Sequence, residues 1–373
     1  MNETSSATEA SAALLRQVGG PFVIEPIQVA APRADEIRVR LTAVGVCHTD
    51  IACRDGFPIP LPVVLGHEGA GVVEAIGSGV TRLAVGDHVV LSFDSCGHCQ
   101  ACAHARPANC GHFLAHNFAG VRLVDGSTPL SQGGQPVHGN FFGQSSFASH
   151  AIAHERNAVK VASDLPLELL GPLGCGVQTG AGAVINSLAL GVGESIAIFG
   201  GGAVGLSALL GARAIDAGTV VVVEPNPARR RLALELGASA ALDPRAVDNV
   251  AEAIREATDG GVLHALDTTA LPAVIAQAID CIKPGGVLGM VGIPAPDAAV
   301  PASLLDLLVK SVTLRPITEG DSDPQTFVPQ LLDFHRQGRF PFDRLVTRFP
   351  FAQINEAMHA AERGEVIKPV LVF

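Results

Sequence analysis

Residues 195–224 read SIAIFGGGAVGLSALLGARAIDAGTVVVVE, and this stretch decides the fold of the chain. An apolar run, Ile196–Phe199, leads into the glycine-rich turn Gly200–Gly205; an Ala/Leu-rich segment and a second apolar run, Val220–Val223, follow. The order strand, turn, helix, strand is that of a βαβ unit. Because the runs are apolar throughout, they are typical of parallel strands that are covered on both faces. The stretch therefore predicts a doubly wound α/β domain.

The glycine turn has the spacing Gly-x-Gly-x-x-Gly at Gly200, Gly202 and Gly205. In a chain with 41 glycines this spacing is weak evidence alone, so its weight comes from the strand before it and the helix after it. Such glycines let the backbone approach a pyrophosphate, and Glu224 ends the second strand, where a carboxylate accepts hydrogen bonds from ribose hydroxyls. A carboxylate there repels a 2′-phosphate, which favours NAD over NADP. Arg229 either tempers that preference or belongs to a solvated helix start.

The rest of the chain indicates two domains. Apolar runs and helical stretches continue to alternate up to Pro316, whereas before about residue 180 short Val/Ile/Leu runs alternate with Gly, Pro and Asp, as in strands and turns. We also expect a strand near Ile367–Phe373 that returns to the first domain. The predicted division is a mostly-β domain over 1–180 and 317–373, and a dinucleotide-binding Rossmann domain over 181–316.

Composition excludes several classes of protein. With 373 residues, 48% of them hydrophobic and 16% charged, the chain has ample apolar matter for two folded domains and is not disordered. Its 36 acidic and 25 basic residues give a formal net charge of −11, which disfavours nucleic-acid and anionic-membrane partners. No apolar run approaches the ~18 residues of a membrane span, and Met1–Ser6 lacks the start of a secretory signal. We therefore expect a cytoplasmic protein.

Four of the eight cysteines lie in one short stretch, at positions Cys96, Cys99, Cys102 and Cys110. Cysteines three residues apart do not easily bridge each other, whereas tetrahedral zinc accepts four thiolates from a tight loop. A closed shell of four thiolates leaves zinc no open position, so we predict a structural zinc that fastens a lobe at about residues 94–113. The alternatives, bystander thiols or disulfides, are disfavoured because no secretory signal is seen.

Three further segments carry metal-ligating residue types, namely GVCHTD at 45–50, GHEG at 66–69 and GCG at 174–176. Together Cys47, His67 and Cys175 offer two thiolates and one imidazole, a set that leaves zinc one open position for water or substrate. Taken singly, each of these residues is more often a packing residue than a ligand. The spacing alone does not show that the three segments converge.

In their order and approximate distances, all these motifs resemble those of the zinc-dependent medium-chain alcohol dehydrogenase family, from about Pro21 to Phe373. Within the family, Phe141–Phe147 and Pro166–Cys175 resemble the aryl-alcohol (benzyl-alcohol) branch. The resemblance implies a GroES-like catalytic domain beside the Rossmann domain, one catalytic and one structural zinc per chain, and NAD as cofactor. It also implies a homodimer or homotetramer that acts on a small-molecule alcohol or aldehyde.

The resemblance also assigns roles around the metals. Cys47, His67 and Cys175 would bind the catalytic zinc, while the four clustered cysteines would bind the structural one. Glu68 would lie behind the catalytic metal and Asp50 would orient the ligand histidine.

Thr49 would accept the proton of the alcohol and pass it to the nicotinamide ribose. In known members a histidine five residues after the first cysteine ligand relays that proton to solvent, but this chain has Ala52 there. Either water or His48 would then carry the proton onward. The sequence does not decide between these two routes.

For the cofactor, the resemblance gives His48 a pyrophosphate contact, Thr179 and Ile293 nicotinamide contacts, and Lys368 a second phosphate contact. For Ile293 and Lys368, ordinary core or surface positions are an equally good interpretation.

We therefore expect NAD-dependent, reversible oxidation of a primary aromatic or allylic alcohol to its aldehyde. Phe93, Phe141 and Phe142 are candidates for an apolar pocket wall, although phenylalanine is more often plain core. A terpenoid, geraniol-like alcohol or a medium-chain aliphatic alcohol is an alternative substrate, since an apolar slot does not sharply distinguish them. A non-catalytic zinc and nucleotide-binding protein and a zinc-independent quinone reductase are disfavoured by the ligand set of the second metal site.

Overall fold

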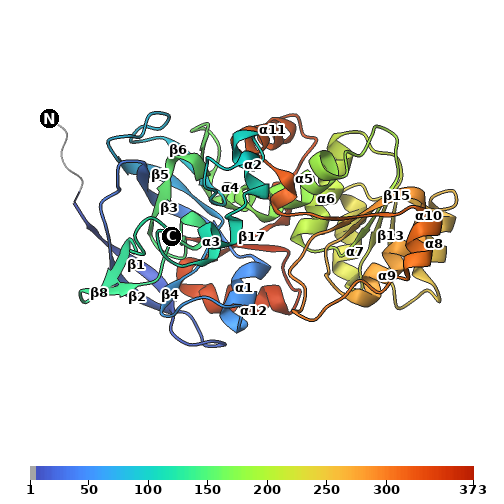
Figure 1. Ribbon diagram of the computed structural model, residues 1–373, viewed down its shortest axis with the longest axis horizontal. Coiled ribbons are helices and arrows are strands. Elements are labelled where there is room, and N and C mark those ends of the chain that lie inside the picture. The colour runs from blue at the N-terminus through green and yellow to red at the C-terminus, as the bar shows by residue number, and fades with distance from the viewer. Residues whose placement is uncertain (1–5) are drawn as a thin grey trace. The chain divides into compact units, whose positions relative to one another are not determined.

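The computed structural model in Figure 1 describes residues 6–373, so most of the N-terminal stretch inspected for a secretory signal lies outside the described residues. The chain forms two compact units. The first unit runs up to Cys175 and adds Asp323–Pro329 and Val346–Phe373, while the second holds Gly176–Ser322 and Gln330–Leu345. These borders differ from the predicted ones at 180 and 317, because residues 176–180 begin a helix that packs within the second unit.

The first unit contains two sheets, with strand orders β4-β1-β2-β7-β8 and β10-β6-β5-β3-β18-β17, and β9 also pairs with β3. All of these pairs are antiparallel except β17 with β18. The strands are β1 (Thr8–Leu15), β2 (Val23–Val29), β3 (Glu36–Gly45), β4 (Val63–Val64), β5 (Gly69–Ile76), β6 (His88–Leu91), β7 (Leu130–Gln132), β8 (Gln135–Val137), β9 (His150–His154), β10 (Ala158–Val161), β17 (Val346–Pro350) and β18 (Lys368–Val372). The α-helices are α1 (His48–Asp55), α2 (Gln100–Ala103), α3 (Phe113–Phe118), α4 (Leu167–Leu170) and α12 (Ile354–Glu362).

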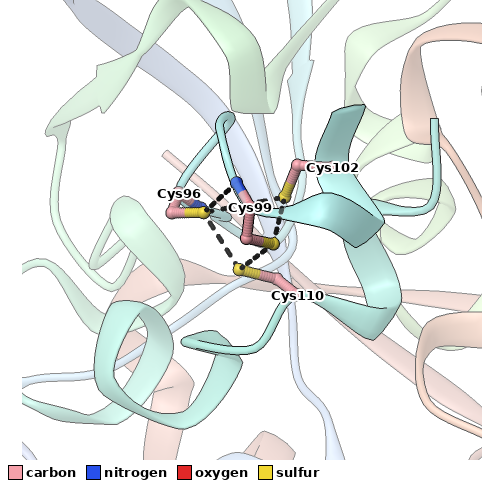
Figure 2. A group of neighbouring side chains, drawn as sticks. All are labelled: Cys96, Cys99, Cys102 and Cys110. Carbon is pink, nitrogen blue, oxygen red and sulfur yellow. Dashed lines mark hydrogen bonds between the residues drawn. The ribbon is translucent and has the colours of Figure 1, made fainter. Parts of the chain in front are cut away.

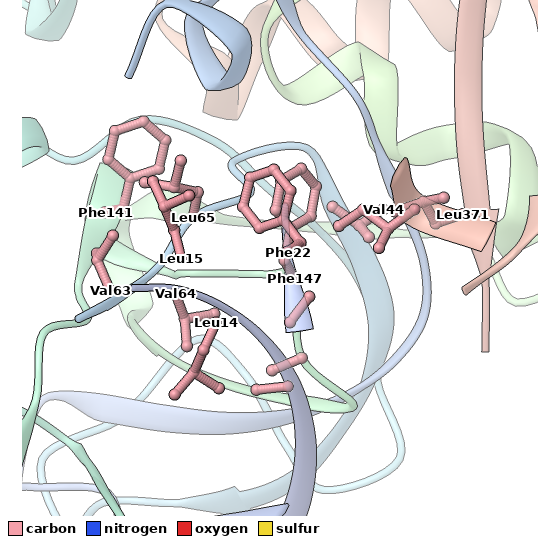
Figure 3. Packing of buried hydrophobic residues seen from close by; sticks show 14 of the residues in the cluster. Leu14, Leu15, Phe22, Val44, Val63, Val64, Leu65, Phe141, Phe147 and Leu371 are labelled. Atoms are coloured by element: carbon pink, nitrogen blue, oxygen red, sulfur yellow. The ribbon is translucent and has the colours of Figure 1, made fainter. Parts of the chain in front are cut away.

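A large apolar cluster holds the first unit together (Figure 3). Its aromatic centre includes Phe22 and Phe147, whose rings meet edge to face at a centroid distance of 5.6 Å. In β18, Leu371 lies opposite Val44 of β3, and both are fully buried. The expected return of the final strand to the first unit is therefore seen in the structure, and burial of its apolar side chains stabilises it there.

The second unit contains a six-stranded parallel sheet of order β13-β12-β11-β14-β15-β16, flanked by helices (Figure 1). Strands β11 and β12 are buried along their whole length, which explains their uninterrupted apolar sequence and confirms the predicted doubly wound fold. The strands are β11 (Ile196–Phe199), β12 (Val220–Val223), β13 (Ala240–Leu242), β14 (Val262–Asp267), β15 (Ile282–Met290) and β16 (Thr313–Pro316). The helices are α5 (Gly176–Gly182), α6 (Ala203–Ala214), α7 (Pro227–Glu235), α8 (Val250–Ala257), α9 (Pro272–Cys281) and α10 (Leu304–Lys310), while α11 (Pro324–Arg336) begins in the first unit and ends in the second.

No helix within residues 6–373 combines the length and the apolar character needed to cross a membrane.

Candidate metal centres and nucleotide site

The structure brings Cys47, His67, Glu68 and Cys175 together, with one ligand atom of each lying within 4.8 Å of all the others. These residues come from three places in the first unit: the start of α1, the turn before β5, and the residue before α5. The Nε2 atom of His67 is buried and makes no hydrogen bond to any described residue. A buried, unsatisfied imidazole nitrogen beside two sulfurs fits a tetrahedral metal that keeps one position open.

Asp50 fixes the orientation of His67. One carboxylate oxygen, Oδ1, lies 3.0 Å from His67 Nδ1 and accepts a 3.1 Å hydrogen bond from the backbone N–H of Gly66. The other oxygen accepts from the N–H of Cys47 at 3.0 Å, because the two residues form the capping box that begins α1. This arrangement directs Nε2 of His67 towards the metal position, so the structure places Asp50 as the resemblance implies.

Charges around the cluster shift the pKa values of His67 and Cys47 in opposite directions. Burial opposes protonation of His67, but the charges of Asp50 and Cys47 outweigh it and hold the pKa of the imidazole well above its usual value. A hydrogen bond with Cys175 and the positive charge of Lys368 hold the pKa of the Cys47 thiol well below its usual value, in spite of desolvation. The thiolate, which binds metal, is thereby favoured at Cys47.

Glu68 and Lys368 form a buried ion pair behind this cluster. The Nζ atom of Lys368 donates to both carboxylate oxygens of Glu68, at 2.8 and 3.0 Å, and to the carbonyl of Val46 at 3.1 Å. Gly45 makes room for the pair, since a Cβ atom there would lie 2.0 Å from a Glu68 oxygen. Burial lowers the pKa of Lys368, but the Glu68 carboxylate outweighs this and raises it.

The structure gives Lys368 a core position, which was one of the two interpretations of this residue beside a phosphate contact. Its ammonium group is buried, and its three N–H groups are engaged within the first unit. No local sequence pattern signals this pair, because its two members are 300 residues apart.

Aromatic side chains surround the His67 side of the cluster. The ring of Phe142 stacks on that of His67 at a centroid distance of 4.4 Å, and Phe141 meets it edge to face at 5.4 Å. Phe113 and Phe118 pack against Phe142 in turn. Two of the three predicted wall residues, Phe141 and Phe142, therefore contact a ligand residue directly, whereas the third, Phe93, contacts Phe113.

Phe142 has an unusual backbone, with a φ of +52°. A non-glycine residue in this region costs about 1–3 kcal/mol and is kept only where its surroundings fix it. The carbonyl of Phe142 accepts a 3.4 Å hydrogen bond from the buried side-chain amide of Asn157. Two residues further on, the Nε2 atom of Gln144 donates to the carbonyls of His67 at 2.9 Å and Ser92 at 3.1 Å. Gln144 is a positioning residue that sequence reasoning missed, since its contacts are made across the fold.

The side chains of Thr49 and His48 lie at the start of α1. The Oγ1 atom of Thr49 is 3.8 Å from the sulfur of Cys47, which places the hydroxyl beside the cluster. His48 is exposed, and Ala52 lies one turn further along the helix with no acid–base group.

The four cysteines of the lobe also converge, and Figure 2 shows their sulfurs directed towards a common centre. The sulfur of Cys99 lies 3.5 Å from that of Cys102 and 3.9 Å from that of Cys110, and Cys96 and Cys102 are 3.9 Å apart. A zinc ion with Zn–S bonds of ~2.3 Å has tetrahedral edges of ~3.8 Å, which these separations match. None of the cysteines forms a disulfide in the described chain. The lobe thus has the donor set and dimensions of a closed zinc site.

The glycine turn of the second unit is shaped for a pyrophosphate. A Cβ atom on Gly205 would lie 1.8 Å from the carbonyl oxygen of Gly200, so only glycine fits where α6 meets β11. A Cβ atom on Gly202 would meet nothing within 4 Å, so this part of the turn is open. Glu224 is buried, and its two oxygens accept from the N–H groups of Gly201 at 2.6 Å and Asn226 at 2.7 Å. The backbone therefore fits a dinucleotide at this edge of the sheet.

The remaining predicted cofactor residues differ in environment. Arg229 is half-buried, and its Nε atom makes no hydrogen bond to any described residue. Ile293 is 36% exposed in the loop after β15. Thr179 is buried in α5, and its hydroxyl donates to the carboxylate of Glu319 at 3.3 Å. Glu319 is a second residue that sequence reasoning missed, because its contact with Thr179 joins positions 140 residues apart.

Comparison with known proteins agrees with both units. Residues 33–163 match the family described as alcohol dehydrogenase GroES-like domain, and residues 203–336 match the zinc-binding dehydrogenase family. A geraniol dehydrogenase of Castellaniella defragrans is 65% identical over 373 residues, which is 100% of both chains. A crystal structure of an alcohol dehydrogenase zinc-binding domain protein from Burkholderia ambifaria has 53% identity and a TM-score of 0.96, covering 99% of this chain and 100% of that one. The benzyl alcohol dehydrogenase of Acinetobacter calcoaceticus has 42% identity and a TM-score of 0.95, covering 98% and 99%.

Proposed function

Because this chain belongs to the zinc-dependent medium-chain alcohol dehydrogenases, we propose that it oxidises a primary allylic alcohol of the terpenoid kind, such as geraniol, to its aldehyde with NAD⁺. The observation that carries this proposal is the 65% identity, over the whole chain, to a geraniol dehydrogenase. The aromatic branch, which the sequence favoured, becomes the second candidate and is supported by the 42% identity to a benzyl alcohol dehydrogenase.

The residues of the first unit fit this chemistry. Zinc held by Cys47, His67 and Cys175 would lower the pKa of an alcohol at its open position. Asp50 orients the imidazole, and the buried pair of Glu68 and Lys368 lies behind the ligands. The buried rings of Phe141 and Phe142 contact His67 and keep water away from the histidine side of the site.

In this proposal the hydroxyl of Thr49 takes up the alcohol proton, and NAD⁺, when bound, would supply the acceptor for the hydride. Onward transfer of the proton uses water or the exposed ring of His48, because Ala52 has no group that titrates. In the second unit, Gly200, Gly202 and Gly205 would hold the pyrophosphate and Glu224 the adenosine ribose, which favours NAD⁺ over NADP⁺. Arg229 is the nearby cation that would temper this preference.

Initial rates of NADH formation test the proposed activity. With zinc-replete protein we expect the highest kcat/KM on geraniol with NAD⁺, a lower value on benzyl alcohol and the lowest on ethanol, since a larger apolar substrate removes more apolar surface from water on binding. A chelator should abolish all three rates. A preference for benzyl alcohol would contradict the terpenoid branch and keep the chemistry, whereas inactivity on every alcohol would contradict the enzyme itself.

Replacing Thr49 by alanine is expected to lower kcat by roughly 10²-fold or more, because a positioned acid–base group contributes about that factor. The Thr49→Ser variant keeps a hydroxyl beside Cys47 and should retain most of the activity. Stopped-flow measurement of NADH formation would compare the two variants. A kcat of Thr49→Ala within a few-fold of the parent value would contradict the proton-accepting role.

We further propose that the chain forms a homo-oligomer through α10. Leu304, Leu305, Leu308 and Val309 on this helix are 67–85% exposed, and a monomer rarely leaves so many large apolar side chains together in water. Light scattering of the purified protein measures the mass and so tests the proposal. A cytoplasmic location, expected from the sequence, stays a prediction.

A further inference from the structure

The segment that carries His67 connects β4 to β5, and residues 144–147 run beside it. The backbone N–H groups of Ser146 and Phe147 donate hydrogen bonds to two carbonyls of this segment, at 2.7 and 2.9 Å. The approach is close, since a Cβ atom on Gly66 would lie 2.5 Å from the backbone nitrogen of Phe147. Glycine is therefore required next to the histidine so that the two segments can pair.

The side-chain amide of Gln144 continues this pairing up to the histidine itself. Its Nε2 atom donates to the carbonyl of His67 at 2.9 Å. Its Oε1 atom accepts from the N–H of Gly69 at 3.1 Å and from the hydroxyl of Ser146 at 2.6 Å. A buried backbone segment needs such partners, because an unpaired carbonyl or N–H group inside a protein is costly. The amide of Gln144 thus fixes the backbone on both sides of the ligand position.

The same amide is linked to a second predicted ligand through Ser92. Its Nε2 atom also donates to the carbonyl of Ser92 at 3.1 Å, and the hydroxyl of Ser92 donates to the carbonyl of Gly174 at 2.6 Å. Gly174 directly precedes Cys175 and packs on the end of β6, since a Cβ atom there would lie 2.0 Å from the carbonyl oxygen of Leu91. A continuous chain of buried hydrogen bonds therefore joins the backbone of His67 to the residue before Cys175.

Metal binding depends on the spacing of the ligand residues as well as on their identity. Asp50 orients the ring of His67, but the distance between His67 and Cys175 is set by their backbones, which lie in separate segments of the chain. A sound metal site keeps its bond lengths within about 0.2 Å of the ideal values. Groups behind the ligands typically contribute about 10- to 100-fold to metal affinity or activity. A buried bridge between two ligand segments is placed to make such a contribution.

We propose that Gln144 and Ser92 are positioning residues for the catalytic zinc, which together fix the spacing of His67 and Cys175. Both side chains act through the backbone of the ligand segments and not through contact with the metal. The inference rests on the proposed binding of zinc by Cys47, His67 and Cys175.

The rate at which the holoenzyme loses zinc to a chromogenic chelator tests this role without any turnover. Gln144→Met keeps the length of an unbranched side chain and removes its hydrogen bonds, so we expect the catalytic zinc to leave about tenfold faster or more. The phase of release that belongs to this zinc is the one missing from His67→Ala. Loss of the zinc held by the four-cysteine lobe should stay within about twofold of the parent rate, as for an independent site.

Ser92→Ala interrupts the bridge at its other end and is the smaller change. It should speed the loss of the catalytic zinc by a smaller factor than Gln144→Met. In the double variant the effect should be less than the product of the two single effects, because both residues act in one chain of hydrogen bonds. An effect equal to that product would contradict the bridge. Ser92→Ala also carries the test if Gln144→Met does not fold.

A matched control and a spectroscopic measurement separate positioning from general stability. Asn355→Leu removes a side-chain amide that pairs with the N–H and the carbonyl of Phe22, at 2.9 Å each, and belongs to neither metal cluster. This control should lower the unfolding temperature without changing the rate of zinc loss. In Co²⁺-substituted protein the absorption bands depend on the coordination geometry, so Gln144→Met should shift them and Asn355→Leu should leave them unchanged.

The outcomes that would overturn the proposal differ from those that would overturn the metal site. Unchanged zinc loss and an unchanged Co²⁺ spectrum in both Gln144→Met and Ser92→Ala would contradict the positioning role. Equal acceleration of zinc loss in Gln144→Met and Asn355→Leu would contradict it as well, and both results would leave the zinc site intact. If the parent protein held one zinc ion per chain, the proposed catalytic site would fail and the bridge with it.

Discussion

The His67→Ala variant is expected to have a kcat/KM lower by roughly 10³-fold or more. The catalytic metal would be lost, and with the metal the several kcal/mol of charge stabilisation that it supplies. His67 is fully buried, and its Nε2 atom lacks any hydrogen bond among the described residues. Removal of the ring would leave the sulfurs of Cys47 and Cys175 as the remaining ligands from the predicted set. Two protein ligands hold zinc poorly, so the metal content should fall from two zinc ions per chain to one.

Metal analysis by mass spectrometry, alongside steady-state rates, would check both parts of this expectation. His359→Ala is the matched control, because that histidine is exposed on α12, away from both cysteine clusters in sequence and in contacts. The control should keep both zinc ions and the full rate. A His67→Ala protein with two zinc ions, or with a rate near that of the parent, would show that the catalytic metal is held elsewhere.

The second large effect concerns stability. We expect Cys110→Ser to lower the free energy of unfolding by several kcal/mol, because zinc binding by a closed thiolate site is itself folding free energy. The lobe has few other contacts that can replace the metal: α2 buries none of its residues, and α3 buries only Asn117. The sulfur of Cys110 also accepts from the N–H groups of Cys96 and His112, both at 3.4 Å, and serine is too short to keep those contacts.

Urea unfolding followed by far-ultraviolet circular dichroism would measure this loss, since the chain has no Trp or Tyr to report by fluorescence. Cys281→Ser is the matched control, because Cys281 is equally buried in α9 and belongs to neither cysteine cluster. We expect Cys281→Ser to lower the free energy of unfolding by about 1–3 kcal/mol, because the substitution buries a hydroxyl group in an apolar environment. Equal losses in the two variants would argue that Cys110 contributes packing alone.

The sequence predicted best those features that depend on neighbouring residues. The glycine turn and the four-cysteine lobe are each encoded in one continuous stretch, so spacing and chemistry sufficed. The cluster of Cys47, His67 and Cys175 was different, because its members lie in separate segments and only the family resemblance joined them. Their convergence had to come from the structure.

Other features depended on packing that no pattern in one segment reveals. The family resemblance gave Lys368 a phosphate contact, and no local pattern pointed to a carboxylate 300 residues away. The left-handed backbone of Phe142 and of Glu319 goes against the preference of both residue types, so local propensity argued against it. In each case the tertiary contacts of a functional region override the local rule.

The way β18 completes the first unit has a consequence for synthesis on the ribosome. This strand carries Lys368, pairs with β3, and follows the entire second unit along the chain. The second unit can therefore fold as soon as it emerges, whereas the first must wait with an unpaired edge on β3 and an uncompensated Glu68. During that interval the exposed β3 edge is open to wrong pairing, so rapid completion of the chain or chaperone binding between the two stages would be an advantage for this protein.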